Sequence, residues 1–200
     1  MKELSVFVDC RIADLHDKSL DRWYRRPPKE MNPASSLRSV ILAQHFTNFK
    51  VWSFEDQARR RDMEDSYIVG VKRSIDLWNQ RRNDLAEKID EFVLSRLKER
   101  IGATAEAHSE TAGMMVDRLS ILSLKTRHMR THALKKNDPA LAAECSEKLK
   151  VLKQQRKDLC GHLEKLIAEF CAGRRYFKSY RQFKQYNDPR LNPLIKTRRA

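Results

Sequence analysis

The sequence predicts an all-α protein, an elongated antiparallel bundle of about five helices followed by a basic, aromatic C-terminal tail. Three observations predict this class. Only 5 of the 200 residues are glycine and 6 are proline, too few for the turns of a many-stranded sheet. Apolar residues (40%) and charged residues (34%) are both abundant, as in proteins built from long helices. Apolar side chains also recur at the seven-residue spacing of packed helices over long stretches without proline.

Five helices are expected along the chain, separated by recognisable stop and start signals. Ser36 is a good N-cap for the second helix, and Pro139 suits the first position of the fifth. Gly102 and Gly173 are expected to end the third and fifth helices. Because the connections are short, neighbouring helices should run antiparallel. From the amino end, the helices are expected over about residues 4–23, 35–63, 65–100, 104–136 and 139–171.

The chain length suits one domain with a sizeable core. We expect an N-terminal helix and basic linker (1–34), a core bundle (35–172) and a basic aromatic tail (173–200). No run of residues approaches the roughly 20 apolar residues of a membrane span, and no secretory signal is visible. The four cysteines form no C-x-x-C pair and suit a reducing compartment. The expected localisation is therefore cytoplasmic.

Two arginines interrupt apolar helix seams. Arg82 occupies a position of the third helix where the seven-residue pattern calls for isoleucine, and Arg156 interrupts a leucine row of the fifth helix. A guanidinium stays charged, so its burial demands an anion, either a carboxylate of this chain or a ligand. We expect both arginines to be largely buried beside an acid, with Glu110 and Asp117 as the favoured partners.

Polar residues gather on one sector of the second helix and on one face of the fourth. On the second helix, this sector contains Ile41, His45, Asn48, Trp52, Glu55, Asp56 and Arg59. It faces either an internal polar pocket or solvent, and the pattern does not decide between them. On the fourth helix, Glu110 and Asp117 should lie on one side, about 10 Å apart. Arg118 and Lys125 flank them, and Gly113 between them is typical of a close neighbour or a ligand.

Other site chemistries have little support in the sequence. His128 and His132 have the i,i+4 spacing of helical metal ligands, but no E-x-x-H pattern accompanies them, so surface histidines and no metal are expected. No phosphate-binding glycine loop and no activated nucleophile is recognisable. No cofactor is expected.

The tail from Gly173 onward carries nine Lys or Arg residues and one acid, Asp188, so it holds +8 of the net charge of +14. Its five interleaved rings are Tyr176, Phe177, Tyr180, Phe183 and Tyr186. Alternating bases and rings suit a polyanion. The ring spacings of three and four favour instead a short helix packed onto the bundle, and we expect this second arrangement.

Four strings of the sequence resemble an uncharacterised bacterial family, the domain-of-unknown-function family numbered 4254. They are NFKVWSFEDQAR (48–59), KRSIDLWNQRRNDLAEKID (72–90), ETAGMMVDRLSILSLK (110–125) and FKSYRQFKQYNDPRLNP (177–193). The resemblance covers most of the chain from about Ser35 onward. It implies an all-helical cytoplasmic protein whose gene often lies near genes for lipopolysaccharide and other envelope-glycan synthesis. It implies no particular activity and no catalytic residues.

Three functions remain open. The first is a pocket that binds or acts on a small anionic metabolite such as a sugar phosphate or nucleotide-sugar. In it, Glu55, Glu110 or Asp117 would be general acid/base or would bind hydroxyls. The binding residues would be His45, Asn48, Trp52, Arg59, Asn79, Arg82, Arg118, Lys125 and Arg156. The second is binding of nucleic acid or an anionic membrane by the tail. The third is a non-enzymatic partner or regulator of envelope-glycan enzymes; the oligomeric state is open.

Overall fold

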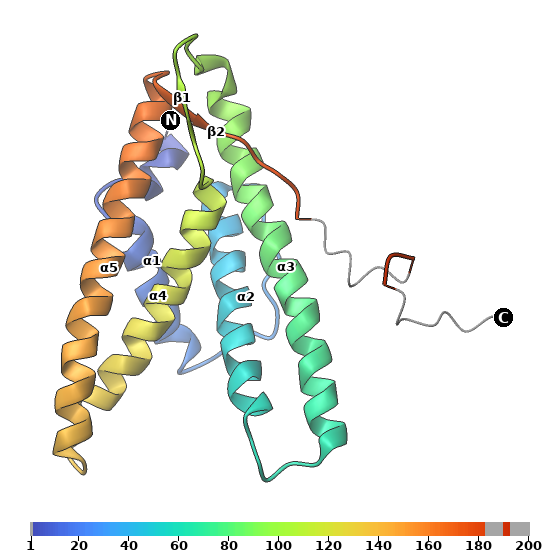
Figure 1. Ribbon diagram of the computed structural model, residues 1–200, viewed down its shortest axis with the longest axis vertical. Coiled ribbons are helices and arrows are strands. Elements are labelled where there is room, and N and C mark those ends of the chain that lie inside the picture. The colour runs from blue at the N-terminus through green and yellow to red at the C-terminus, as the bar shows by residue number, and fades with distance from the viewer. Residues whose placement is uncertain (1, 183–189, 193–200) are drawn as a thin grey trace.

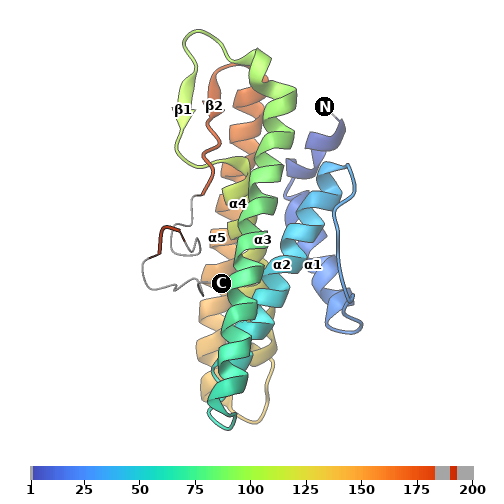
Figure 2. The same ribbon diagram turned by 90° about the vertical axis from the view of Figure 1, so that its right-hand side faces the viewer.

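A computed structural model describes residues 2–182 and 190–192 and shows an all-α bundle, as the sequence predicts. Its helices are α1 (Arg11–Trp23), α2 (Leu37–Ala58), α3 (Asp65–Leu97), α4 (Ala112–Ala133) and α5 (Pro139–Cys171). Two antiparallel hairpins, α2–α3 and α4–α5, meet near one end and separate toward the other (Figure 1). Figure 2 shows α1 on one side of these hairpins and a short strand pair on the other.

The predicted caps of α2 and α5 are confirmed. The Ser36 hydroxyl accepts a hydrogen bond from the Ser39 amide at 3.2 Å at the start of α2. Asp138 caps α5 in the same way, and Pro139 is its first residue. Gly173 follows the end of α5 with a φ of +74°, a conformation that favours glycine.

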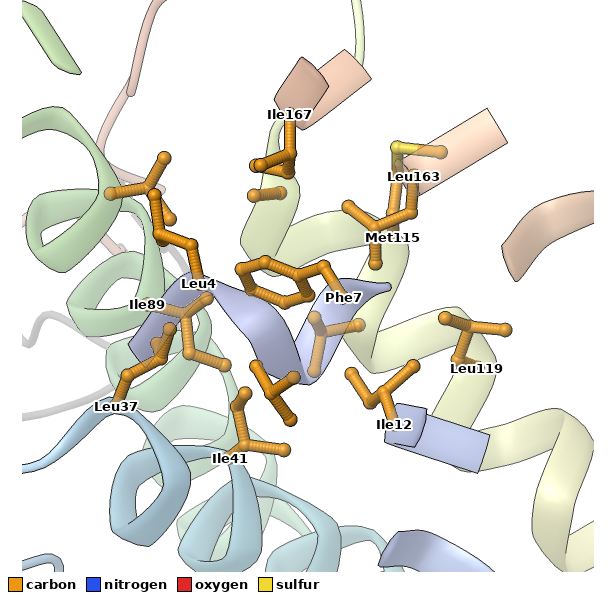
Figure 3. Packing of buried hydrophobic residues seen from close by; sticks show 14 of the residues in the cluster. Leu4, Phe7, Ile12, Leu37, Ile41, Ile89, Met115, Leu119, Leu163 and Ile167 are labelled. Atoms are coloured by element: carbon orange, nitrogen blue, oxygen red, sulfur yellow. The ribbon is translucent and has the colours of Figure 1, made fainter. Parts of the chain in front are cut away.

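The prediction of one unbroken first helix is wrong. The chain forms a 3₁₀ helix over Lys2–Phe7 before α1, and Asp9 and Cys10 between them have φ values of 53° and 55°. Such left-handed residues cannot continue an α-helix, so the axis changes direction there. This bend brings Phe7 into the core, as Figure 3 shows, with only 1% of its surface exposed.

The predicted fourth helix begins too early. Thr111 is its N-cap, because the Thr111 hydroxyl accepts a hydrogen bond from the Met114 amide at 3.2 Å. Upstream, Glu106–His108 forms strand β1, which pairs in parallel with β2 (Arg175–Phe177). Glu110 therefore lies in the segment before α4 and not on the helix.

The strand pair also corrects the expected tail helix. Phe177 is buried, with 1% exposure, and packs edge-on against Phe170 with 5.5 Å between ring centroids. Tyr176 is partly buried, but Tyr180 is exposed by 76%, so its expected packing is wrong. Phe183, also expected to pack, lies outside the described residues. Packing of the tail onto the bundle is thus confirmed for Tyr176 and Phe177, which lie in a strand and not in the expected helix.

One apolar core joins every helix of the bundle. Figure 3 shows side chains from the N-terminal segment and from α2 to α5 meeting around Phe7. The labelled residues are Leu4, Phe7, Ile12, Leu37, Ile41, Ile89, Met115, Leu119, Leu163 and Ile167. Within the described residues, no helix is long and apolar enough to cross a membrane.

The backbones of α3 and α4 touch at Gly113, the second residue of α4. A Cβ at this position would lie 2.1 Å from the carbonyl oxygen of Ala86, so only glycine fits. The Gly113 amide also donates a hydrogen bond to Oδ1 of Asp90 at 2.6 Å. The expected close neighbour of this glycine is thus α3 itself, and the contact sets the distance between the polar residues that precede Ala86 on α3 and those that follow Gly113 on α4.

Candidate functional site

A polar cleft of about 440 Å³ lies between α3 and α4, beside the Gly113 contact. Its volume falls within the range of small-molecule sites. Lining residues on each helix are spaced by three or four, which places them on facing surfaces. The cleft is lined by Asp76, Asn79, Arg82, Asn83, Ala86, Glu110, Met114, Asp117, Arg118 and Gln182.

Arg82 is the most unusual residue of the cleft. Its Nε lies 3.6 Å from Oδ1 of Asp117, so the expected acid partner is confirmed. This distance is longer than a hydrogen bond, and the buried Nε has no hydrogen-bond partner in the described part of the chain. The side chain keeps 29% of its surface exposed at the cleft. Arg82 is therefore a loosely paired cation at the edge of a polar cavity.

Glu110 does not pair with either seam arginine, so that part of the prediction is wrong. It forms an ion pair with Arg118, which lies one turn beyond the contact of α4 with α3. Both side chains line the cleft, and both also line a larger hollow of about 690 Å³ between α4 and α5. The Glu110–Arg118 pair thus forms the ridge between two neighbouring cavities.

Asp117 lies at the back of the cleft and is held by side chains of α2. Its Oδ1 accepts hydrogen bonds from Gln44 at 2.5 Å and from Asn48 at 2.9 Å. Burial raises the pKa of Asp117 above its usual value, and the nearby Arg82 and the two amides only partly offset this effect. The carboxyl therefore holds a proton more readily than an exposed aspartate.

A chain of hydrogen bonds leads from Asp117 into the interior. Asn48 also donates to the Ser120 hydroxyl at 3.0 Å, and Ser120 lies 2.7 Å from Nδ1 of His45. His45 Nε2 lies 3.2 Å from the carbonyl oxygen of His16, which can only accept, so Nε2 carries the hydrogen and Nδ1 accepts from Ser120. The first half of the polar sector of α2 therefore faces inward.

His16 and His45 form a buried stack, with ring centroids 4.1 Å apart and no exposed surface. Burial lowers the pKa of His45 to about 3. It lowers the pKa of His16 well below its usual value as well, and the neighbouring His45 and Arg156 act in the same direction. Both rings are therefore neutral at physiological pH.

Arg156 does not converge on the cleft with Arg82. It is only 15% exposed, as the seam position predicts, but its acid partner is Asp17 of α1 and not Glu110 or Asp117. It also donates to the Ser123 hydroxyl at 3.3 Å. Arg156 thus joins α5 to α1 and α4, away from the residues that line the cleft.

Four other predicted site residues lie outside the polar cleft. Glu55 and Arg59 form an ion pair of 3.2 Å with each other near the end of α2. Trp52 stacks on His128, with 4.6 Å between centroids, and Lys125 is exposed on α4. Asn79, by contrast, lines the cleft as expected.

The two histidines weighed as metal ligands have other surroundings. His128 lies 2.5 Å from the Tyr24 hydroxyl through its Nε2, and His132 lines an apolar groove. No cluster of three metal-ligating side chains occurs in residues 2–182 and 190–192.

Sequence reasoning missed four residues that support or surround the site: Gln44, Ser120, His16 and Asp17. Two of them carried a usable signal. Gln44 precedes Asn48 by four residues and Ser120 follows Asp117 by three, so each lies on the same helix face as a predicted residue. The two residues of α1 carried no such signal, because their contacts depend on how α1 packs.

The fold and the cleft define a helical-bundle protein with a polar interhelical cavity whose walls come from α3 and α4, with Asp117 held by side chains of α2. The chain belongs to the family described as protein of unknown function (DUF4254), whose family model matches residues 38–179. The match spans α2 to β2 and therefore includes both walls of the cleft. No curated protein and no solved structure matches the chain.

Proposed function

We propose that the cleft between α3 and α4 binds a small hydroxylated anion, of the sugar phosphate or nucleotide-sugar class. The observation that carries this proposal is the state of Arg82. A partly buried guanidinium without a hydrogen bond to the described chain is costly, because it has lost water contacts without full replacement. The buried Nε is out of reach of a ligand, but the rest of the guanidinium is exposed at the cleft and can donate to a phosphate oxygen there, which would balance a charge that Asp117 pairs only loosely.

The charges around the cleft restrict the ligand. Two bases, Arg82 and Arg118, face three acids, Asp76, Glu110 and Asp117. This balance opposes a highly charged anion and favours one anionic group joined to a neutral, hydrogen-bonding body. The amides of Asn79, Asn83 and Gln182 and the acids can bind hydroxyl groups, as sugar-binding sites do.

Asp117 is the group best placed to transfer a proton in such a complex. Its raised pKa brings it nearer to the operating pH, and its Oδ1 is fixed by Gln44 and Asn48. The proposal therefore includes an acid/base role for Asp117, with Arg82 and Arg118 holding the anionic group. The proposed setting is envelope-glycan synthesis, in keeping with the family resemblance.

No specific observation favours polyanion binding by the tail over this proposal. Of the tail bases that the structure describes, Arg175 forms ion pairs with Glu106 and Glu169, and Arg181 forms one with Glu91. These ion pairs neutralise part of the positive charge that would otherwise be available to bind the phosphates of a nucleic acid.

The test is a thermal-shift screen of sugar phosphates and nucleotide-sugars with wild type and two variants. A ligand that binds only the native state raises the melting temperature by mass action. The Arg82→Met variant should lose the shift. Arg73→Met, which removes an exposed arginine from the same helix outside the cleft, should keep it.

An Asp117→Asn variant separates binding from proton transfer. It should retain the ligand-induced shift while losing any turnover of the same compound, since an amide cannot exchange the proton. A screen in which no compound shifts the wild type, or in which Arg82→Met and Arg73→Met respond alike, would contradict the proposal.

A further inference from the structure

An apolar groove of about 470 Å³ lies between α4 and α5, along the C-terminal half of α4, whereas the polar cleft lies along its N-terminal half. Its walls come from α4 and α5, and Trp52 of α2 contributes a ring. The groove is lined by Trp52, Lys125, His128, Met129, His132, Lys148, Val151, Leu152 and Gln155.

The apolar wall of the groove is exposed and well supported. Val151 has 58% of its surface exposed although it sits beside Leu152 and Met129. Trp52 is fixed by its stack on His128, which is in turn held by the Tyr24 hydroxyl. A bundle that leaves such a surface open loses the free energy of burying it, so an apolar ligand would gain that free energy on binding.

The charges at the groove are of one sign. Its lining contains two lysines and no carboxylate. Lys148 forms an ion pair with Glu144 of its own helix, so its charge is balanced. Lys125 has no hydrogen bond or ion pair within the described residues. The free positive charge therefore lies at the Lys125 end of the groove.

The same end borders the larger polar hollow. Lys125 and Gln155 line both the groove and the 690 Å³ cavity between α4 and α5. A ligand that left the groove at this end would therefore meet an ammonium, an amide and open polar space, whereas the rest of the groove offers carbon atoms.

We infer that this groove binds a single-chain alkyl phosphate, with the alkyl chain against Met129, Val151 and Leu152 and the phosphate at Lys125. We take the occupant to be a dissolved monomer and not a membrane surface, because the lining residues form a concave groove of about 470 Å³, a size that suits a single small molecule. The site is separate from the cleft at Arg82 and does not depend on the function proposed there.

Titration with dodecyl phosphate below its micellar concentration tests the inference, by calorimetry and by tryptophan fluorescence. Dodecyl phosphate should bind at least ten times more tightly than either inorganic phosphate or dodecanol. Inorganic phosphate lacks the alkyl chain that would contact the apolar wall, and dodecanol lacks the phosphate that would bind Lys125. Val151→Asp should weaken binding at least thirty-fold, and Lys125→Gln about ten-fold.

Two variants on α3 serve as controls for the groove variants. Val69→Asp introduces the same charge at an exposed valine, and Lys72→Gln removes one exposed lysine, both outside the groove. Both should bind dodecyl phosphate like the wild type. Trp52→Phe should keep the heat of binding and lose most of the fluorescence change.

The results also separate this inference from the function of the cleft. Arg82→Met should leave dodecyl phosphate binding unchanged, even if it abolishes binding of sugar phosphates. Equal affinity for dodecyl phosphate and inorganic phosphate, or equal losses in Val151→Asp and Val69→Asp, would overturn the inference. So would a wild-type dimer that Val151→Asp dissociates, because a second copy would then cover the groove.

Discussion

Both terminal nitrogens of Arg156 donate to Asp17, one to each carboxylate oxygen, at 2.6 Å and 3.0 Å. The pair joins α5 to α1 across 139 residues of sequence. Such a bidentate ion pair, with two parallel hydrogen bonds, is stronger than a contact through a single hydrogen bond. Since Arg156 is 15% exposed and Asp17 is 37% exposed, the arginine depends on its partner more than the acid does.

Removing the acid should therefore lower the free energy of unfolding more than removing the arginine. Asp17→Asn leaves a mostly buried guanidinium uncompensated and should lower the free energy of unfolding by about 2–3 kcal/mol. Arg156→Met leaves a half-exposed carboxylate and fills the seam, so about 1–2 kcal/mol is expected. Urea denaturation of both variants measures the difference. Glu144→Gln, which breaks an exposed pair on α5, should change stability by less than about 1 kcal/mol.

Substitution of Gly113 should be among the most damaging single changes in the protein. The added Cβ of Gly113→Ala would meet the Ala86 carbonyl oxygen at 2.1 Å, and a helix backbone cannot rotate away. The expected loss is about 3 kcal/mol or more. Gly161→Ala is the matched control, because its Cβ meets nothing within 4 Å; it should stabilise by about 0.5–1 kcal/mol. Similar melting temperatures for the two variants would refute the backbone contact.

The buried His16 makes stability dependent on pH. Burial lowers the pKa of His16 in the folded protein below its value of 6.5 in the unfolded chain. Stability is therefore highest above pH 6.5, where both states hold a neutral ring, and falls as the pH drops below 6.5. At pH 5 the unfolded histidine is protonated, which costs folding about 2 kcal/mol. His16→Phe should therefore raise stability by about 2 kcal/mol more at pH 5 than at pH 8. Denaturation curves at the two pH values give this difference, and a difference near zero would exclude a neutral buried His16.

The buried Asp90 should make the protein less stable as the pH rises, the opposite of the effect of His16. Burial raises its pKa to about 6, although the Gly113 amide and Thr111 favour the charged form. Because the folded value is raised above the usual 3.8, the native state binds the proton more tightly, and stability is lost as the pH rises through 6. Asp90→Asn keeps the acceptor for Gly113 and cannot ionise. It should equal the wild type near pH 4 and exceed it by up to about 3 kcal/mol at pH 8, as measured by denaturant unfolding.

Two truncations should separate the roles of the tail. Removing residues 173–200 deletes β2 and the buried Phe177, and should cost about 3–5 kcal/mol. Removing residues 179–200 keeps both and should leave the melting temperature nearly unchanged, although it removes six of the nine tail bases. If removal of residues 179–200 alone abolishes salt-sensitive binding of nucleic acid or anionic vesicles, the result would support the polyanion alternative.

Sequence patterns predict the helical core. They also predict the acid partner of Arg82, but not that of Arg156. Seven-residue spacing predicts that Arg82 and Arg156 lie in helix seams, because packed helices repeat at that period, and the structure leaves their side chains 29% and 15% exposed. Asp117 is predictable as the partner of Arg82, since both lie on the facing surfaces of sequential helices. Asp17 is not, because periodicity says nothing about which face α1 packs against, and the left-handed Asp9 and Cys10 redirect the chain just before it.

The strand pair was beyond the reach of pattern reasoning for a different reason. β1 and β2 have three residues each, shorter than any window in which alternation can be recognised. Their pairing is stabilised by neighbours distant in sequence, including the Gly102 amide, which donates to the Gly173 carbonyl at 3.0 Å. Because α4 begins only at Ala112, Glu110 precedes the helix, and the helical spacing expected between Glu110 and Asp117 does not apply.

The contact between Gly113 and Ala86 joins the backbones of the two hairpins, which meet near one end of the bundle and separate toward the other (Figure 1). Rotation of α3 by about 5° about this point would move Arg82, four residues away, by only about 0.5 Å. The first turn of α3, some twenty residues away, would move by about 3 Å. A pivot at this contact would therefore leave the distance between Arg82 and Asp117 nearly constant, whereas the ends of the hairpins farthest from it would move most.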